Sequence, residues 1–186
     1  MKFTKSLIKG KLVKRYKRFF TDVKLNKEVV TAHCPNTGSM MGLLDEGNQV
    51  FISKNDNPKR KLKYTLEIIK VKKDLIGVNT HFANKIAFHG LSNNLIKEIT
   101  NSDNIKPEVF FDKETRFDFL VEKNKKKIFV EVKNVTLSRN ENIAEFPDSV
   151  TSRGSKHLKA LIEATKKGYK TYLLFLIQIE HVESFK

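Results

Sequence analysis

Three side chains in the second half of the chain have the types and spacing needed for metal-dependent chemistry on a phosphodiester. Glu131 and Lys133 are two residues apart in the β-like run 127–135, and Asp118 lies in the preceding run 116–122. Because side chains alternate along a β-strand, Glu131 and Lys133 should share one face of their strand, and the other face should be aliphatic. This pattern predicts a catalytic site rather than a purely structural strand.

The polar segment 123–126 predicts a four-residue hairpin loop between the two runs. In that register Glu122 lies opposite Lys127, and Asp118 lies opposite Glu131 with the Cβ atoms about 4.5–5.5 Å apart. Two carboxylates at this separation repel each other unless positive charge lies between them. The neighbouring ammonium and a divalent cation could supply it, and carboxylate oxygens suit Mg²⁺ or Mn²⁺.

The predicted reaction is hydrolysis of a phosphodiester with Asp118, Glu131 and Lys133 as catalytic residues. The metal, held by Asp118 and Glu131, would neutralise the phosphate and lower the pKa of a bound water, which Lys133 would position or activate. Glu98 is a candidate third carboxylate. The alternative is a surface ion-pair ladder, because Glu-x-Lys is common on exposed strands.

The first part of the chain, residues 1–80, consists of short β-like runs broken by turn residues, with no long helical pattern. Five or six short strands at this spacing predict a small OB-like barrel, a fold that commonly binds single-stranded nucleic acids. The expected strands are residues 7–13, 15–24, 29–33, 49–53, 64–71 and 75–78.

Residues 81–186 have a different pattern, which predicts a mixed-sheet α/β domain. Residues 81–89 and 91–100 are expected to be helical, and a longer helix is expected over 149–167, capped by Asp148 and ended by Gly168. A buried strand over 171–179 follows. This strand–helix–strand order predicts a right-handed parallel crossover.

The charge balance favours a polyanionic partner, and we expect DNA. The chain has 36 Lys and Arg against 21 Asp and Glu, a net charge of +15. Residues 1–85 contain 19 basic and 7 acidic residues, against 17 and 14 in residues 86–186, so the excess lies in the predicted barrel. A codon bias towards Lys could explain part of the surplus, and an anionic surface or protein is the alternative partner.

Four groups of residues are candidate nucleic-acid contacts. Two lie in the predicted barrel: one follows a Pro turn, and the other interleaves with Tyr16, Phe19 and Phe20, which are alternatively core residues. A third forms one polar face of the long helix, which could contact phosphate or support the metal-ligand shell. The fourth is a loop expected near the site. The alternatives are a structured turn for this loop, and solvated surface for the helix face and for the segment after the Pro turn. They are Lys59, Arg60, Lys61 and Lys63; Arg15, Lys17 and Arg18; Arg153, Lys156 and His157; and Asn36, Thr37 and Ser39.

A cytoplasmic, soluble protein is expected. The single cysteine, Cys34, excludes an internal disulfide, and the charged N-terminus has no apolar segment typical of a signal peptide. The longest apolar run is too short to cross a bilayer. Cys34 is a poor candidate nucleophile, because His33 is adjacent in the strand and should point to the opposite face.

Several stretches of the chain carry a resemblance to a known family. They are TAHCPNTGSM (31–40), NPKRKLKYT (57–65), GVNTH (77–81), RFDFL (116–120), EVKNVTL (131–137), FPD (146–148), RG (153–154) and KHL (156–158). On these stretches the sequence resembles the sugar fermentation stimulation protein A family, and Asp118 with Glu131-Val132-Lys133 resembles the PD-(D/E)xK nuclease pattern.

The resemblance implies an N-terminal OB-like domain, a nuclease-like C-terminal domain, sequence-independent DNA binding and a role in regulating sugar (maltose) metabolism. Members of this family usually continue further, so the second domain is expected to be short or truncated at its C-terminus.

Two functions therefore remain open for the predicted DNA-binding protein. In the first, the acid–lysine site hydrolyses phosphodiesters with Mg²⁺ or Mn²⁺. In the second, the protein binds DNA in a regulatory role and the nuclease scaffold is catalytically silent. An RNA-directed role is a weaker alternative. The sequence leaves the oligomeric state open.

Overall fold

The chain forms two compact units. The computed structural model describes residues 3, 5–140 and 142–186. The first unit, here the barrel unit, comprises residues 1–81, 135–149 and 177–186, and the second, the sheet unit, comprises residues 82–134 and 150–176. The sequence prediction divided the chain near residue 80; the structure groups two later segments, 135–149 and 177–186, with the barrel.

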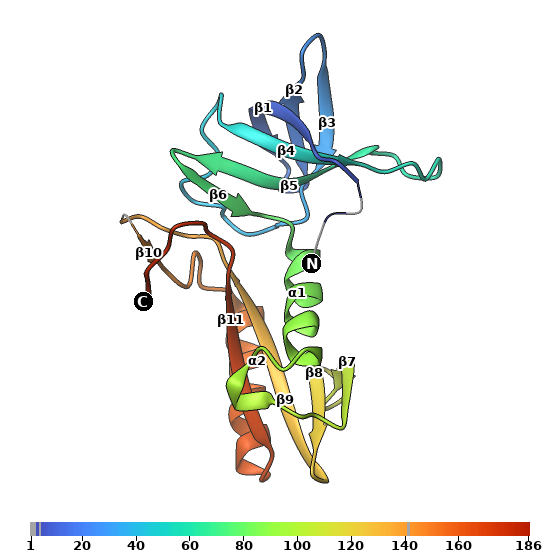
Figure 1. Cartoon of the computed structure of the whole chain (residues 1–186), viewed down its shortest axis with the longest axis vertical. Coiled ribbons are helices and arrows are strands. Elements are labelled where there is room, and N and C mark those ends of the chain that lie inside the picture. Colours follow the sequence, from blue (N-terminus) through green and yellow to red (C-terminus); the bar gives the residue numbers. More distant parts are fainter. Residues whose placement is uncertain (1–2, 4, 141) are drawn as a thin grey trace. The chain divides into compact units, whose positions relative to one another are not determined.

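The barrel unit is built on a six-stranded sheet in the order β3-β2-β1-β4-β5-β6 (Figure 1). A parallel pairing of β3 with β5 closes the first five strands, which confirms the predicted OB-type barrel. The strands are β1 (Ile8–Tyr16), β2 (Phe20–Lys24), β3 (Val29–His33), β4 (Gln49–Lys54), β5 (Tyr64–Val71) and β6 (Asp74–Gly77).

Alternating apolar side chains from these strands fill the barrel. Leu12, Val23 and Val50 are each at most 1% exposed, and the polar residues next to them in their strands are exposed or partly buried. β5 is buried more continuously, because Thr65 and Glu67 beside Leu66 are also buried. The break between the first two strands was predicted at residue 14 but lies further along the chain. The chain turns at residues 17–19, where Lys17 and Arg18 have φ values of 47° and 62°.

The sheet unit contains four strands in the order β11-β9-β8-β7. Neighbours β7 and β8, and β8 and β9, are antiparallel. Gln178 N–H donates to the carbonyl oxygen of Val135 at 3.0 Å, so the carboxyl ends of β9 and β11 meet and these two strands run parallel. The mixed sheet agrees with the prediction. The strands are β7 (Asn104–Phe110), β8 (Arg116–Lys123), β9 (Lys126–Val135) and β11 (Lys170–Ile177).

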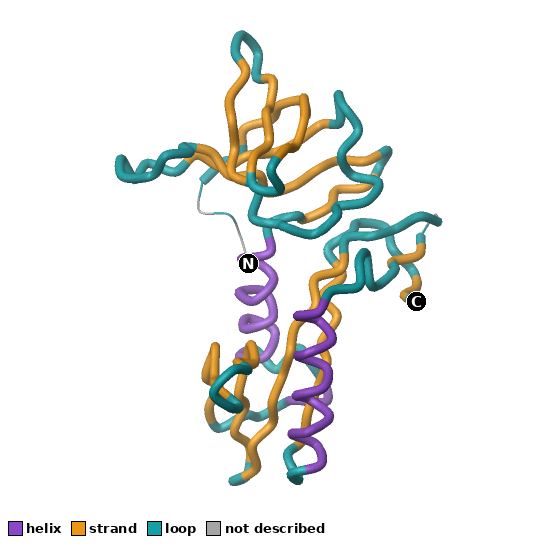
Figure 2. Tube along the Cα trace, turned by 180° about the vertical axis from the view of Figure 1, so that it is seen from behind, coloured by secondary structure: helices purple, strands orange, loops and turns teal. Residues whose placement is uncertain are grey.

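Two helices cover opposite faces of this sheet, as Figures 1 and 2 show together. α1 (Thr80–Ser92) packs against a core that includes Phe119 and Val130, and α2 (Ser152–Lys166) packs against Phe117 and Phe129. No helix in the described ranges is long and apolar enough to cross a bilayer.

Two predictions about the helices of residues 81–186 were wrong, and one strand was not predicted. A second helix over 91–100 is absent, and only a short 3₁₀ helix, η1 (Lys97–Ile99), forms there. The cap of α2 is Thr151, whose hydroxyl accepts from Gly154 N–H at 3.0 Å, rather than Asp148. β7 was not predicted, because Pro107 and exposed polar residues hide its alternation.

A small parallel pair, β10 (Ile143–Ala144) with β12 (Ser184–Phe185), belongs to the barrel unit.

Candidate metal centre

The β8–β9 hairpin carries the acidic and basic side chains of the site. Its ladder runs from Lys123 opposite Lys126 to Phe119 opposite Val130 and includes the predicted pair Glu122–Lys127. The connection is a two-residue turn rather than four residues. Asn124 and Lys125 have φ values of 48° and 63°, the left-handed conformation that two-residue hairpin turns require.

The ladder stops one pair short of Asp118 and Glu131, so the predicted direct pairing of these acids is not formed. The alternation of β8 also breaks here. Phe117 packs in the core under α2 and Phe119 in the core under α1, although a regular strand would place both on one face. Asp118 therefore lies at an irregularity of β8, between Phe117 and Phe119.

The irregularity turns the Asp118 carboxylate towards two fixed donors. Asn84 of α1 donates its Nδ2 hydrogen to Oδ1 at 2.7 Å, and the backbone N–H of Val132 donates to Oδ2 at 2.7 Å. The side chain thus takes the place of a ladder acceptor at the point where the two strands separate. Both bonds hold the Asp118 carboxylate in a fixed orientation next to the Glu131 backbone.

Glu131 is the most deeply buried acid of the site, 4% exposed. Its Oε1 accepts from Lys133 Nζ at 2.7 Å and lies 2.7 Å from His157 Nδ1 on α2. Its Oε2 is buried and has no hydrogen-bond partner. An unpaired buried oxygen of this kind costs about 1–3 kcal/mol or more, so a ligand that satisfied it would be stabilised there.

The donor set suits a hard divalent cation. Asp118 and Glu131 offer carboxylate oxygens, and the unpaired Oε2 of Glu131 is the atom that a metal would satisfy. Among the described residues, no group of three or more His, Cys, Asp or Glu side chains is arranged to hold a metal. The remaining positions would therefore belong to water and phosphate, as in sites where Mg²⁺ keeps several waters.

The structure separates the residues predicted on the long helix. His157 joins Glu131, whereas Lys156 Nζ pairs with Glu114 Oε2 at 2.7 Å on the surface. Arg153 is exposed. Glu98 is exposed in η1, and among the described residues it belongs to no group of three metal-binding side chains, so its role as a third carboxylate stays a prediction.

Sequence reasoning did not identify Asn84 and left the role of His157 open. Asn84 is a partly buried residue of α1 with no motif around it, and only its bond to Asp118 indicates a role in the site. His157 was expected either to contact phosphate or to support the ligand shell, and its bond to Glu131, with the side chain 13% exposed, favours the second role. The two residues are 26 positions apart, so no local sequence pattern predicts that they are in contact.

In the barrel unit, Arg15 and Arg18 hold a loop rather than projecting freely. Arg15 Nη2 donates to the carbonyl oxygens of Arg18 at 3.0 Å and Asn36 at 2.8 Å, and Arg18 Nε donates to that of Thr37 at 2.9 Å. The β1–β2 turn is therefore tied to residues 36–37. Lys17 in the same turn is exposed.

The loop over residues 34–39 is a compact structured turn. Asn36 Oδ1 accepts from Gly38 N–H at 2.8 Å, and Ser39 Oγ donates to Asp148 Oδ2 at 3.2 Å. A Cβ at Gly38 would lie 3.0 Å from both acceptor oxygens, so a larger residue there would displace these two side chains. Cys34 is buried. The side-chain oxygens of Asn36 and Ser39 thus have partners within the barrel unit.

The segment that carries Lys59, Arg60, Lys61 and Lys63 leads into β5. Its three lysines are exposed and Arg60 is partly buried. The pKa of His33, on β3, is lowered by burial and then by the positive charges of Arg60 and His81. Arg60 therefore lies close enough to His33 to act on it electrostatically.

The fold and these residues define a chain of two parts, an OB-type barrel and a mixed-sheet α/β unit with an acid–lysine cluster. Residues 13–78 match the family described as the SfsA N-terminal OB domain, and residues 81–186 match the sugar fermentation stimulation protein RE domain. The chain belongs to the sugar fermentation stimulation protein family.

Similar proteins support this placement. The sugar fermentation stimulation protein homolog of Pelagibacter ubique (strain HTCC1062) is 81% identical over 186 residues, which cover 100% of this chain and 80% of the relative. The homolog of Maricaulis maris (strain MCS10) is 48% identical over 96% of this chain and 77% of its own. The structure of Pyrococcus furiosus SfsA in complex with Ca²⁺ matches with a TM-score of 0.90 and 26% identity, covering 100% of this chain and 78% of that one.

Proposed function

We propose that this chain is a cytoplasmic DNA-binding protein whose sheet unit holds a divalent cation, Mg²⁺ or Mn²⁺, on Asp118 and Glu131 and hydrolyses phosphodiesters there. The observation that carries the proposal is the buried, unpaired Oε2 of Glu131 beside the Lys133 ammonium. The Pyrococcus relative was solved with Ca²⁺, another hard cation with oxygen ligands, which supports a cation site in this family.

Different residues of the site orient the two carboxylates. Lys133 and His157 bind Oε1 of Glu131 and so orient Oε2. Asn84 and the Val132 N–H orient the carboxylate of Asp118. When bound, the cation would supply charge neutralisation of the phosphate and acidification of a water. The Lys133 ammonium adds a second positive charge beside the phosphate.

DNA as the substrate rests on charge and on the barrel. Residues 1–85 carry 19 basic against 7 acidic residues, and each phosphate that they neutralise releases counterions. OB-type barrels commonly bind nucleic acids. The names of the curated relatives support a role in sugar fermentation, and DNA binding by a regulator, including one of maltose metabolism, is consistent with it.

A second candidate function is DNA binding by a catalytically silent scaffold. The observation in its favour is the small number of protein ligands, because the described residues present no group of three metal-binding side chains. Both oxygens of Asp118 are already hydrogen-bonded within the protein. In this case the site would have a structural or cation-sensing role without turnover.

Cleavage assays separate the two functions. The protein is incubated with single-stranded and duplex DNA in Mg²⁺, Mn²⁺ or chelator, beside Asp118→Asn, Lys133→Ala and the control Lys166→Ala, an exposed residue at the end of α2. The first function predicts metal-dependent cleavage by wild type and the control that both site variants lose. DNA binding without cleavage by wild type under all metal conditions would leave only the silent scaffold.

A further inference from the structure

One end of the barrel brings together basic side chains from segments far apart in sequence. The parallel pairing that closes the barrel places His33 of β3 opposite Thr65 of β5. Arg60 lies in the segment that leads into β5, and this segment is closed by the bond from Asn55 N–H to the Lys63 carbonyl at 2.7 Å. The end of β3 and the loop before β5 therefore meet where β3 pairs with β5 and closes the barrel, here called the seam.

The first turn of α1 joins the same end. Asn79 Oδ1 accepts from His81 N–H at 3.0 Å, and Asn79 Nδ2 donates to Glu67 Oε2 of β5 at 2.7 Å. Thr80 Oγ1 donates to the Pro35 carbonyl at 3.1 Å. These bonds fix His81 within the barrel unit beside the seam.

The acid beneath this end is buried and bonded within the protein. Glu67 is 4% exposed, and its oxygens are held by Ser53 Oγ at 2.5 Å and Asn79 Nδ2 at 2.7 Å. Burial raises the pKa of Glu67, and the positive charges of Arg60 and His81 oppose this shift, so both basic groups lie near Glu67. The same two groups add to burial in lowering the pKa of His33, so His33 lies near them as well.

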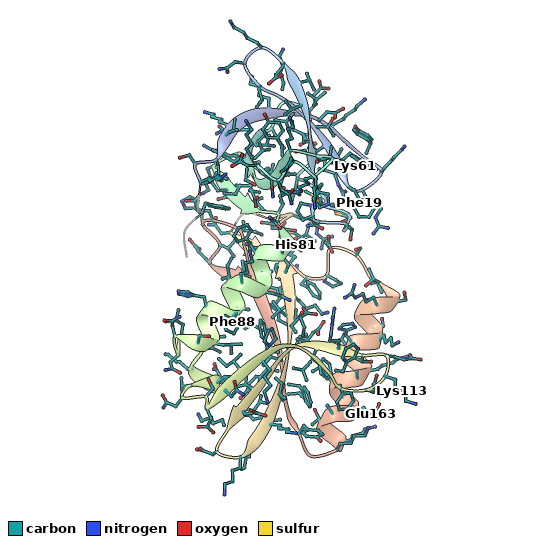
Figure 3. The ribbon with its side chains drawn as sticks, turned by 90° about the vertical axis from the view of Figure 1, so that its right-hand side faces the viewer. Phe19, Lys61, His81, Phe88, Lys113 and Glu163 are labelled. Atoms are coloured by element: carbon teal, nitrogen blue, oxygen red, sulfur yellow. The ribbon has the colours of Figure 1, made fainter. Side chains whose placement is uncertain are left out.

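Phe19, a residue with an exposed ring, lies beside the end of β3. Phe20 pairs with His33, and the Cys34 N–H donates to the Phe19 carbonyl at 2.8 Å. The Phe19 side chain is 47% exposed. Figure 3 shows Phe19 and Lys61 on the same side of the barrel unit. Basic groups beside an exposed ring are typical of surfaces that bind single strands, because bases stack on rings and phosphates bind cations.

We propose that His33, Arg60 and His81 form a phosphate seat for single-stranded nucleic acid, with Phe19 as the adjacent stacking surface. The seat lies in the barrel unit and is separate from Asp118 and Glu131. The inference rests on the proposed DNA binding, and it names the strand type and the residues that contact it. It does not require a metal.

Binding of a fluorescent single-stranded oligonucleotide in the presence of chelator tests the seat. Arg60→Ala should weaken binding at least about fivefold and lower the slope of log affinity against log salt by about 1. Phe19→Ala should weaken binding about tenfold with little change in that slope. His33→Gln and His81→Gln should each weaken binding, and circular dichroism verifies that every variant is folded.

The matched control is Lys27→Ala. This exposed lysine lies in the β2–β3 turn, at the opposite end of the hairpin from His33, and its loss removes the same charge as Arg60→Ala. An equal loss of affinity in the two variants would overturn the seat and leave general electrostatic binding. No oligonucleotide binding by wild type would instead refute the proposed DNA binding itself.

Two further probes identify the ligand. Duplex DNA of the same length should bind more weakly, and its affinity should not depend on Phe19; an equal dependence would contradict single-strand recognition. Inorganic phosphate should compete with the oligonucleotide for wild type and not for Arg60→Ala. Phosphate binding that requires Arg60, with oligonucleotide affinity unchanged by the substitution, would assign the seat to a free anion and overturn the nucleic-acid assignment.

Discussion

Asp118 accepts a hydrogen bond from the backbone N–H of Val132, the residue between Glu131 and Lys133, at 2.7 Å. The bond forms where the β8–β9 ladder has just ended, so a side chain replaces the backbone acceptor that a regular strand would offer. It links the first acid to the segment that carries the second acid and the lysine. The site therefore depends on a departure from regular β-structure.

Asn84 should control the orientation of the Asp118 carboxylate. Asn84→Ala removes the donor at 2.7 Å and should weaken Mn²⁺ binding about three- to tenfold, because an interaction of about 1 kcal/mol fixes the ligand. Asn84→Asp should bind Mn²⁺ more tightly than Asn84→Ala, since it adds a carboxylate. Calorimetric titration measures both affinities, and equal affinity in wild type and Asn84→Ala would contradict the role.

His157 should act as a positioning residue through Glu131. Its removal in His157→Ala leaves Oε1 with Lys133 alone, and we expect about tenfold weaker Mn²⁺ binding. His157→Gln keeps a donor group and should recover part of the affinity. A purely structural role would instead lower the melting temperature of both variants and leave their Mn²⁺ affinity unchanged.

The Arg139–Glu145 pair in the barrel unit should make stability depend on pH. Arg139 donates to Glu145 through its backbone N–H, Nε and Nη2 at 2.8–3.1 Å, and these bonds lower the carboxyl pKa to about 2 from 4.5. A depressed folded-state pKa stabilises the fold above pH 4.5, and this contribution is lost as the pH falls towards 2.

Melting temperatures measured from pH 7 to pH 2 test this pair. Arg139→Ala should melt lower than wild type at pH 7, and the difference should shrink as the pH approaches 2. The control Lys167→Ala removes an exposed ion pair with Glu163 and should change the melting temperature little. A wild-type advantage over Arg139→Ala that stayed constant across this range would contradict the pKa assignment.

Much of the fold could be predicted from residue patterns. Short alternating runs with turn residues identified the barrel, and the register of the β8–β9 hairpin followed from the pairing of Glu122 with Lys127. The turn length was wrong, yet a two-residue and a four-residue connection centred on the same residues give the same pairing. β7 was missed because Glu108 has a φ of 54° and Pro107 interrupts the pattern.

The site was less predictable because tertiary contacts decide it. The alternation of side chains along β9 predicted that Glu131 and Lys133 share one face, and they form an ion pair at 2.7 Å. Regular alternation along β8 did not predict the surroundings of Asp118, because the strand is irregular there and Asn84 of α1 is a hydrogen-bond partner. The bond between His157 and Glu131 depends on how α2 packs on the sheet, which no local pattern encodes.

The most direct test of the metal proposal is anomalous diffraction from crystals soaked in Mn²⁺. The proposal predicts a Mn²⁺ peak bound by Oε2 of Glu131 and by the Asp118 carboxylate, which disappears in Glu131→Gln crystals soaked in the same way. Well-ordered Asp118 and Glu131 side chains with no Mn²⁺ between them at saturating concentration would contradict it.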